Sequence, residues 1–304
     1  MFWIFAWILL ALWGCTYVEE GAEDREPLRL TFLDVGQGLA VLLEQGGRFA
    51  LYDAGPDSSG IADTLEARGI RELDWVVLSH NHRDHVGGFL ELAGGASSAE
   101  KIQVRQLYVG ADTAGGLWRD SVLYVVLKQG IPVDTLVRGS VLSLGVGGCE
   151  PAAVEGGALV DGESPQLRVL WPTEYDRVEG NHGSVVLEVA WGESSALLTG
   201  DLDSLGERQL LELSPTLSAG LLQVPHHGSA GSSSLAFLAQ VSPEYAVVSV
   251  GDGNPYGHPV PEVSQKLKFV LGDSLRFFRT DQQGSVSFEM SRDFGAIPLS
   301  APKR

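Results

Sequence analysis

Short apolar runs separated by glycine-rich turns dominate the first part of the chain. Each run is too short for a typical helix, and pairs of glycines fall between neighbouring runs. This rhythm predicts a meander of antiparallel strands. The three runs are LRLTFLDV (28–35), LAVLLEQ (39–45) and RFALYDAG (48–55).

The remaining chain alternates between further strand-like runs and segments whose apolar residues recur at helical spacing. No stretch within 28–292 resembles a linker, and no fixed-period repeat is apparent. This order predicts one α/β domain of two packed sheets with helices outside. Helices are predicted at 61–70, from 86 onward, within 115–133, and at 204–214, 232–242 and 261–270. Strands are predicted at 73–80, 101–110, 140–145, 167–171, 184–191, 195–199, 220–225, 245–251, 275–280 and 285–290.

The N-terminus, MFWIFAWILLALWGC, carries no charged side chain. Its apolar run is short for a membrane span, which needs roughly 20 residues. The end of the run, LWGC, resembles a lipobox, which predicts a lipid-modified Cys15. An uncleaved anchor from Phe2 to about Val18 and a buried N-terminal helix are the alternatives. We expect an exported protein of the cell envelope, held at the membrane by the lipid or by the apolar anchor.

These patterns divide the chain into three predicted segments. Residues 1–27 form the signal or anchor and an acidic tether, 28–294 form the folded domain, and 295–304 form a polar tail. The chain has 304 residues, of which 44% are hydrophobic and 20% charged, so it can bury a substantial core. Its two cysteines are too few for a disulfide framework.

The net charge is −18, from 39 acidic and 21 basic residues. Such a surface repels nucleic acid at long range, unless a local basic patch or a bound metal overrides the repulsion. Multivalent cations are attracted instead.

The seven histidines lie in short stretches rich in glycine, serine or proline, and three of them fall within SHNHRDHVGG (79–88). Neutral imidazole and carboxylate groups are the ligands that zinc prefers. His80 and His82 are two residues apart, so an extended loop projects both to one side. Asp84 and His85 follow after a turn and reach a different point. This spacing favours two adjacent metals over one, and the glycines of Val86-Gly87-Gly88 allow a tight turn into a helix.

Six motifs occur in order between about residue 29 and 290: FLDVGQG, LYDAG, SHNHRDHVGG, LLTGD, VPHHGS and YGHP. This series resembles the metallo-β-lactamase fold hydrolases and, more narrowly, the metallo-β-lactamase-like domain of ComEC-type competence proteins. Phosphocholine esterases of the bacterial envelope share similar motifs. The resemblance implies a four-layer αββα sandwich.

The resemblance also implies a set of metal ligands. His80 and His82 would hold the first metal, Asp84 and His85 the second, and Asp201 would bridge both. His182 stands near the position of the family's third ligand to the first metal, with Asn181 as the alternative.

Adjacent histidines on an extended strand end point in opposite directions. We therefore assign His227 to the second metal and His226 to an orienting or proton-relay role. His258 lies in a loop fixed by prolines, where it could bind the substrate phosphate, protonate the leaving group or complete the second metal site. Asp84, His226 and His258 are the candidate catalytic residues.

Two further aspartates end predicted strands. Asp34 and Asp53 are expected to hold a ligand imidazole, or the loop itself, in place. Leu39 departs from the family pattern, in which an acidic residue commonly follows DVGQG.

Two divalent ions, zinc or else manganese, lower the pKa of a bridging water towards 7 and neutralise charge on the substrate. The sequence therefore predicts an envelope-tethered metal-dependent phosphodiesterase or nuclease. Its substrate would be nucleic acid, a nucleotide or an envelope phosphodiester. The alternatives are a hydrolase of carboxyl esters, lactones or β-lactams, and a non-catalytic metal-bound recognition module of a DNA-uptake or envelope complex.

Overall fold

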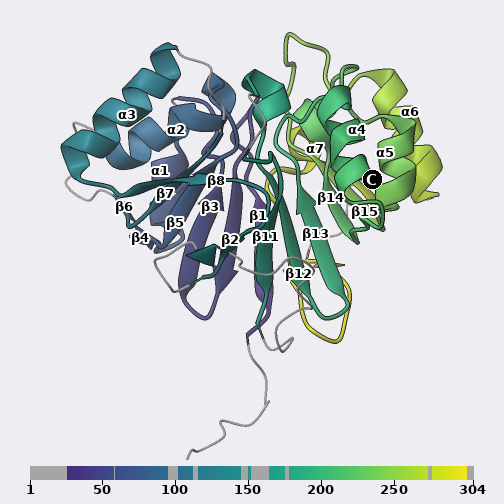
Figure 1. Ribbon diagram of the computed structural model, residues 1–304, viewed down its shortest axis with the longest axis horizontal. Coiled ribbons are helices and arrows are strands. Elements are labelled where there is room, and N and C mark those ends of the chain that lie inside the picture. The colour runs from purple at the N-terminus through teal and green to yellow at the C-terminus, as the bar shows by residue number, and fades with distance from the viewer. Residues whose placement is uncertain are drawn as a thin grey trace, which may run out of the picture.

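The computed structural model describes residues 26–57, 59–94, 102–111, 116–144, 150–151, 164–174, 178–272 and 276–299. Two eight-stranded sheets stack face to face, and helices cover the outer face of each (Figure 1). This is the four-layer αββα sandwich that the resemblance implied. The expected anchor and Cys15 lie outside the described residues. None of the helices within the described ranges is both long and apolar enough to cross a membrane.

The N-terminal sheet has the strand order β18-β17-β1-β2-β3-β5-β7-β8. Its first three strands in sequence form the predicted antiparallel meander, and β3, β5, β7 and β8 run parallel. Three helices cover its outer face: α1 (Ile61–Ala67), α2 (Arg83–Gly94) and α3 (Leu117–Gln129). The strands are β1 (Leu28–Phe32), β2 (Val41–Gln45), β3 (Arg48–Tyr52), β5 (Trp75–Leu78), β7 (Leu107–Gly110), β8 (Val133–Leu136), β17 (Val286–Met290) and β18 (Ile297–Pro298).

The C-terminal sheet has the strand order β10-β9-β11-β12-β13-β14-β15-β16, and its last four strands run parallel. Its helices are α4 (Ser204–Leu213), α5 (Leu235–Val241) and α6 (Pro261–Leu271). The strands are β9 (Ser140–Leu142), β10 (Glu150–Pro151), β11 (Gln166–Trp171), β12 (Val186–Trp191), β13 (Ser194–Leu198), β14 (Leu221–Gln223), β15 (Tyr245–Val248) and β16 (Phe277–Arg279). The short helix α7 (Thr280–Gln283) follows β16, and β4 (Glu72–Leu73) pairs with β6 (Gln103–Val104).

Three apolar clusters separate the four layers. Side chains alternate along each strand, so one strand serves two clusters. In β3, Ala50 and Tyr52 belong to the core between the sheets, whereas Leu51 packs in the cluster beneath α1 and α2. A third cluster lies under α4, α5 and α6. Continuous apolar runs such as WVVL are therefore strands that are buried on both faces.

Three local expectations differ from the structure. The predicted strand 101–110 is divided into β6 and β7, which belong to different sheets. Within the predicted polar tail, β18 pairs with β17. The helix expected from residue 86 begins at Arg83 and includes Gly87 and Gly88, so these glycines do not form the turn that precedes it.

Candidate metal centre

The histidine and aspartate motifs meet at the carboxyl ends of neighbouring strands. His80 follows β5, Asp201 follows β13, His227 follows β14 and the loop with His258 follows β15. In open α/β sheets, ligands bind in the crevice outside these strand ends. The two sheets therefore each contribute part of one polar site.

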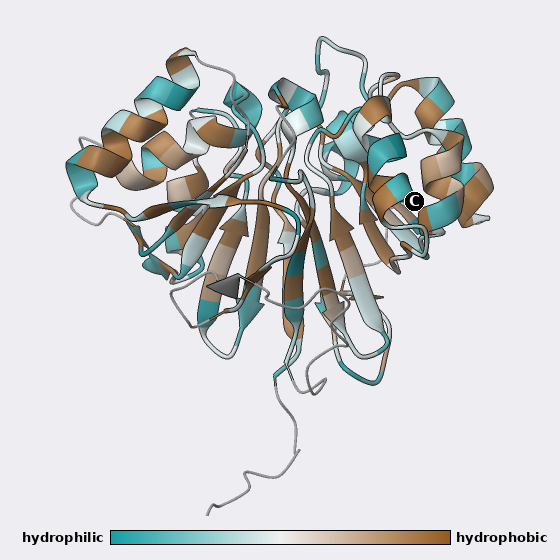
Figure 2. Ribbon diagram, viewed as in Figure 1, coloured by the Kyte–Doolittle hydropathy of each residue, from teal (hydrophilic) through white to brown (hydrophobic). Residues whose placement is uncertain are grey.

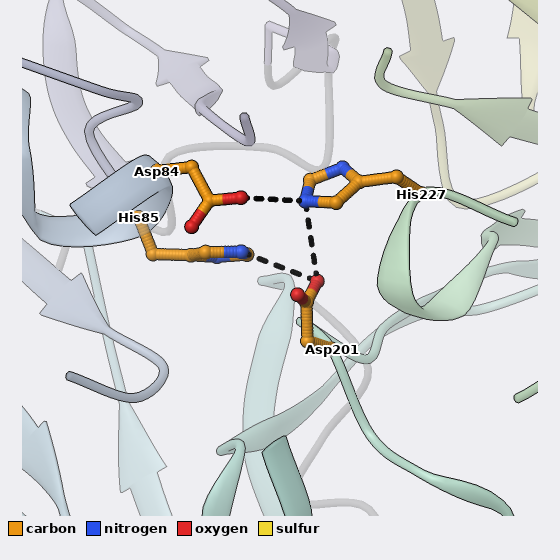
Figure 3. Close-up of side chains that lie close together, drawn as sticks. All are labelled: Asp84, His85, Asp201 and His227. Atoms are coloured by element: carbon orange, nitrogen blue, oxygen red, sulfur yellow. Dashed lines mark ion pairs between the residues drawn. The ribbon is translucent and has the colours of Figure 1, made fainter. Parts of the chain in front are cut away.

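One cluster joins Asp84, His85, Asp201 and His227 (Figure 3). Nε2 of His85 lies 3.2 Å from Oδ1 of Asp201, and Nε2 of His227 lies 3.5 Å from the same oxygen. Nε2 of His227 is also 3.4 Å from Oδ2 of Asp84. These four donor atoms surround one point, in the manner of a divalent metal site.

A second cluster contains His80, His82 and again Asp201. Nε2 of His80 lies 4.0 Å from Oδ2 of Asp201, the carboxylate oxygen that the first cluster does not use. The two oxygens of Asp201 thus face two different groups of donors. This arrangement is the one that a bridging role of Asp201 would require.

The hydrogen bonds of the buried imidazoles fit metal binding. His85 donates from Nδ1 to Oδ2 of Asp53 at 2.7 Å, and His227 donates from Nδ1 to the Ser249 carbonyl at 2.7 Å. Nδ1 of His80 lies 3.1 Å from the Ser79 hydroxyl, which itself donates to Asp53. The Nε2 atoms of all three histidines are buried without a hydrogen-bond partner, as is Oδ1 of Asp201. Buried polar atoms without partners are costly, so the donor set matches a bound cation.

The electrostatics of the cluster are those of buried charges in contact. Burial opposes charge on His85, but the carboxylates of Asp201 and Asp53 outweigh it and raise the pKa of His85 well above its usual value. Burial likewise opposes ionisation of Asp201, yet His85 and His227 hold its pKa well below the usual range. Burial lowers the pKa of His80, which favours the neutral form that binds metal.

Glycines place the first turn of α2 in this site. A Cβ atom on Gly88 would lie 2.0 Å from the Ala54 carbonyl oxygen, and one on Gly87 would lie 2.2 Å from the Asp57 nitrogen. Close approach of the helix backbone to the loop after β3 therefore requires both glycines. The Ala54 amide donates to the His85 carbonyl, and this contact fixes the helix start beside Asp53.

The two adjacent histidines were expected to lie in an extended backbone, but the structure does not have one there. His226 and His227 both adopt left-handed conformations, with φ of 50° and 54°. The two rings therefore do not point in opposite directions. His227 is buried in the first cluster, while Nε2 of the half-buried His226 lies 3.7 Å from Oδ2 of Asp201. The expected extended backbone is therefore wrong, and the assignment of His227 to the second metal stays a prediction.

The proposed ligand role of His182 does not match the structure. Its Nδ1 bonds to Oδ1 of Asp203 at 2.9 Å, and its ring lies against Trp171. It belongs to neither donor cluster. The neighbouring Asn181 lines the site instead, with its amide nitrogen 3.3 Å from both ring nitrogens of His226.

A cavity of ≈ 380 Å³ opens over the two clusters. His258 lines it, with its ring stacked on that of Tyr256 and its backbone amide held by Asn254. The remaining lining residues are Gln37, Asn81, His82, Arg83, Asp84, Trp118, Asn181, Asp201, His226 and His227. A larger cavity of ≈ 630 Å³ lies beside Trp171 and Arg138 and contains none of the clustered residues, so we do not connect it with the site.

The two strand-end aspartates have different roles. Buried Asp53 accepts hydrogen bonds from His85 and from the amide and hydroxyl of Ser79, so it orients a candidate ligand as expected. Asp34 is exposed and accepts from the Gly36 amide at 3.3 Å, which stabilises the loop only. The side chain of Leu39 is buried in the core between the sheets.

Sequence reasoning missed a buried glutamine that connects the ends of β13 and β14. Oε1 of Gln223 accepts from the Thr199 amide at 2.7 Å, and its Nε2 donates to the carbonyls of Gly200 and Val224. These bonds set the backbone just before Asp201 and His226. An isolated polar residue in a short apolar run was the only signal in the sequence.

The chain is similar to several known proteins. A family model described as the metallo-beta-lactamase superfamily matches residues 33–252. ComE operon protein 3 of Bacillus subtilis is 30% identical over 78% of this chain and 27% of its own length. Competence protein ComA of Neisseria gonorrhoeae is 31% identical over 94% of this chain and 36% of its own length. The chain therefore spans only about a third of these relatives.

Two solved structures share the fold at low sequence identity. Igni18, a metallo hydrolase from Ignicoccus hospitalis, is 19% identical with a TM-score of 0.50, over 88% of this chain and 100% of that chain. CmlA, a diiron beta-hydroxylase from Streptomyces venezuelae, is 13% identical with a TM-score of 0.54, over 88% of this chain and 55% of that chain. The sequence matches and the folded site together show that the chain belongs to the metallo-beta-lactamase superfamily, with ComEC-type competence proteins among its homologues.

Proposed function

We propose that the protein is a dinuclear-metal hydrolase of phosphodiesters, with zinc as the expected metal and manganese as the alternative. The observation that carries the proposal is the position of the Asp201 carboxylate. Each of its two oxygens faces a separate group of donors. When bound, two divalent ions lower the pKa of a water molecule between them and neutralise charge on phosphoryl oxygens.

The residues of the chain would then bind the ions, accept a proton and contact the substrate. His80 and His82 would hold one ion, and Asp84, His85 and His227 the other, with Asp201 shared. The half-exposed Asp84 lies at the cavity wall, where it is placed to accept a proton from the attacking water. His226 and His258, whose rings are 5.8 Å apart, line the same cavity and would contact the phosphoryl oxygens and the leaving group.

We further propose that the hydrolase acts at the cell envelope. The support is the apolar N-terminal run with Cys15, followed by an acidic segment. Relatives named for competence favour a nucleic-acid substrate, whereas the net charge of −18 favours a small phosphodiester.

The test is metal content and turnover of the full-length chain. Bound metal would be counted by mass spectrometry, and hydrolysis measured with bis-p-nitrophenyl phosphate, single-stranded DNA and nitrocefin. Phosphodiester turnover with two metals per chain supports the proposal. Turnover of nitrocefin alone would point to the ester or β-lactam alternative, and two metals without any turnover to a recognition module.

A matched pair of histidine variants sharpens this test. His82→Ala removes a proposed ligand and should abolish turnover and reduce the metal count. His182→Ala removes a histidine that faces Asp203 and Trp171, so metal content and turnover should stay within about threefold of wild type. Equal losses in both variants would contradict the ligand assignment.

A further inference from the structure

A second cavity, of ≈ 390 Å³, adjoins the metal centre. It lies between α3 and the ends of β5, β7 and β8, and it shares Asn81 with the cavity over the donor clusters. His80, a proposed metal ligand, also forms part of its wall. The two cavities are therefore neighbours, with Asn81 in the wall of both.

The walls of this second cavity are mainly aliphatic. Leu78 and Val122 are 2% and 4% exposed and form its buried part, while Leu123 and Val133 are 41% and 37% exposed at its rim. The only ring among its lining residues is that of His80. Nucleobases are usually held by stacking on aromatic side chains, which this cavity does not offer. Its walls suit a flexible hydrocarbon chain instead.

Helix α3 connects the two cavities and continues the apolar surface outward. Trp118 lines the cavity over the metals, whereas Arg119, Val122 and Leu123 line the second one. The same helix leaves Leu117, Tyr124 and Leu127 exposed at 75%, 65% and 83%. Figure 2 shows several apolar segments along α3. Among the apolar residues of α3, Val122 and Leu123 are the ones that line the second cavity.

We propose that the second cavity holds an alkyl chain of the substrate, so that the phosphodiester cleaved at the metal centre is amphiphilic, as in a lipid. This inference rests on the proposed function and adds the substrate class. The charged phosphate matches the donor clusters, and the chain matches the aliphatic walls that begin at His80 and Asn81. The charge of −18 opposes a long polyanion but not a molecule with a single phosphate.

The first test measures binding alone and does not require turnover. Ethyl phosphate and hexyl phosphate are titrated calorimetrically into the zinc-loaded, full-length chain. Each buried methylene strengthens binding by about fourfold, so hexyl phosphate should bind at least about tenfold more tightly than ethyl phosphate. Equal affinities, or no binding of either compound, would overturn the inference.

Two substitutions on α3 form the matched comparison. Leu123→Asn alters the rim of the cavity and should reduce the hexyl preference by about tenfold while leaving ethyl phosphate binding unchanged. Leu127→Asn changes a more exposed leucine one turn later, outside the cavity, and should retain the full preference. If both variants show the same hexyl preference, the alkyl chain is bound elsewhere and the inference fails.

Turnover then separates this inference from the proposed function. The p-nitrophenyl phosphodiesters of hexanol, methanol and thymidine are compared by kcat/KM, and the hexyl ester should be preferred. A preference for thymidine would identify a base-binding site and overturn the alkyl assignment. Tight hexyl phosphate binding with no hydrolysis of any ester would support the alkyl site while contradicting the hydrolase.

Discussion

At the scale of single residues, two buried histidines of the site share one arrangement. In His85 and His227 an acceptor takes the Nδ1 proton, and Nε2 is left buried and without a partner. The acceptor therefore fixes both the tautomer and the direction of the ring. A metal ligand prepared in this way loses little freedom on binding.

Asp53→Asn tests this arrangement. The substitution weakens the acceptor of the His85 Nδ1–H and of the Ser79 hydroxyl, so metal affinity should fall by about 10- to 100-fold. Affinity would be measured by competition with a chromophoric chelator. Asp34→Asn, at an exposed aspartate that holds only its own loop, serves as the control and should bind metal as wild type does. Unchanged affinity in Asp53→Asn would refute the orienting role.

The raised pKa of His85 predicts how metal binding depends on pH. Burial opposes its protonation, but Asp201 and Asp53 raise its pKa well above the usual value, and Asp201 also raises that of His227. Without metal, these carboxylates favour protonation of both imidazoles, and a metal competes with that proton for Nε2. Apparent affinity should rise with pH until both are neutral, and binding should release protons. Calorimetry in two buffers of different ionisation enthalpy counts those protons; a count of zero at neutral pH would contradict this account.

The sequence was sufficient to predict how some of these side chains group together, but not how others are placed. The spacing in HNHRDH was sufficient to separate His80 and His82 from Asp84 and His85, because strand and helix geometry act over such short distances. The place of His182 outside both donor clusters depends on tertiary contacts, since its ring bonds to Asp203 and lies against Trp171. The left-handed backbone at His226 and His227 depends on contacts with Gly200 and Ser249, which no local pattern indicates.

Helix α2 is the element on which the site most depends. Its first turn carries Asp84 and His85, and its second turn touches the loop after β3 through two glycines. The sequence predicted the helix, but it located the start too late and gave the glycines a role in a turn. Their true role involves packing against residues some thirty positions earlier, which periodicity does not report. Polar β8 was missed for a similar reason, because its pairing with β7 rather than its own pattern makes it a strand.

Gly88→Ala tests the packing of α2. The added methyl group would meet the Ala54 carbonyl and displace the helix, which should cost about 1–3 kcal/mol of stability and weaken metal binding. Denaturant unfolding and metal competition measure the two effects. Gly231→Ala is the control. Its added Cβ atom would lie 3.8 Å from the Ser229 hydroxyl, which is ordinary van der Waals contact. Wild-type stability in Gly88→Ala would contradict the close approach.

At the scale of the whole molecule, the charge of −18 governs the approach of substrates. If single-stranded DNA is cleaved, its repulsion by the protein should be screened by salt. The kcat/KM for DNA should then rise about two- to tenfold between about 50 and 200 mM salt, the reverse of the behaviour of basic nucleases. The kcat/KM for bis-p-nitrophenyl phosphate, a small substrate of single charge, should change far less. A fall in the DNA value would reveal a local basic surface that outweighs the net charge.

The donors come from both sheets: His80, Asp84 and His85 belong to the N-terminal half, and Asp201 and His227 to the C-terminal half. Coordination would therefore act as a further crosslink between halves that are already joined by the apolar core, the chain connection and the pairing of β17 with β1. A backbone cut between the halves should leave two fragments that stay associated with metal and separate more readily after chelation. Bound metal would in this way stabilise the association of the two halves. Protein without metal should be cleaved by proteases more readily.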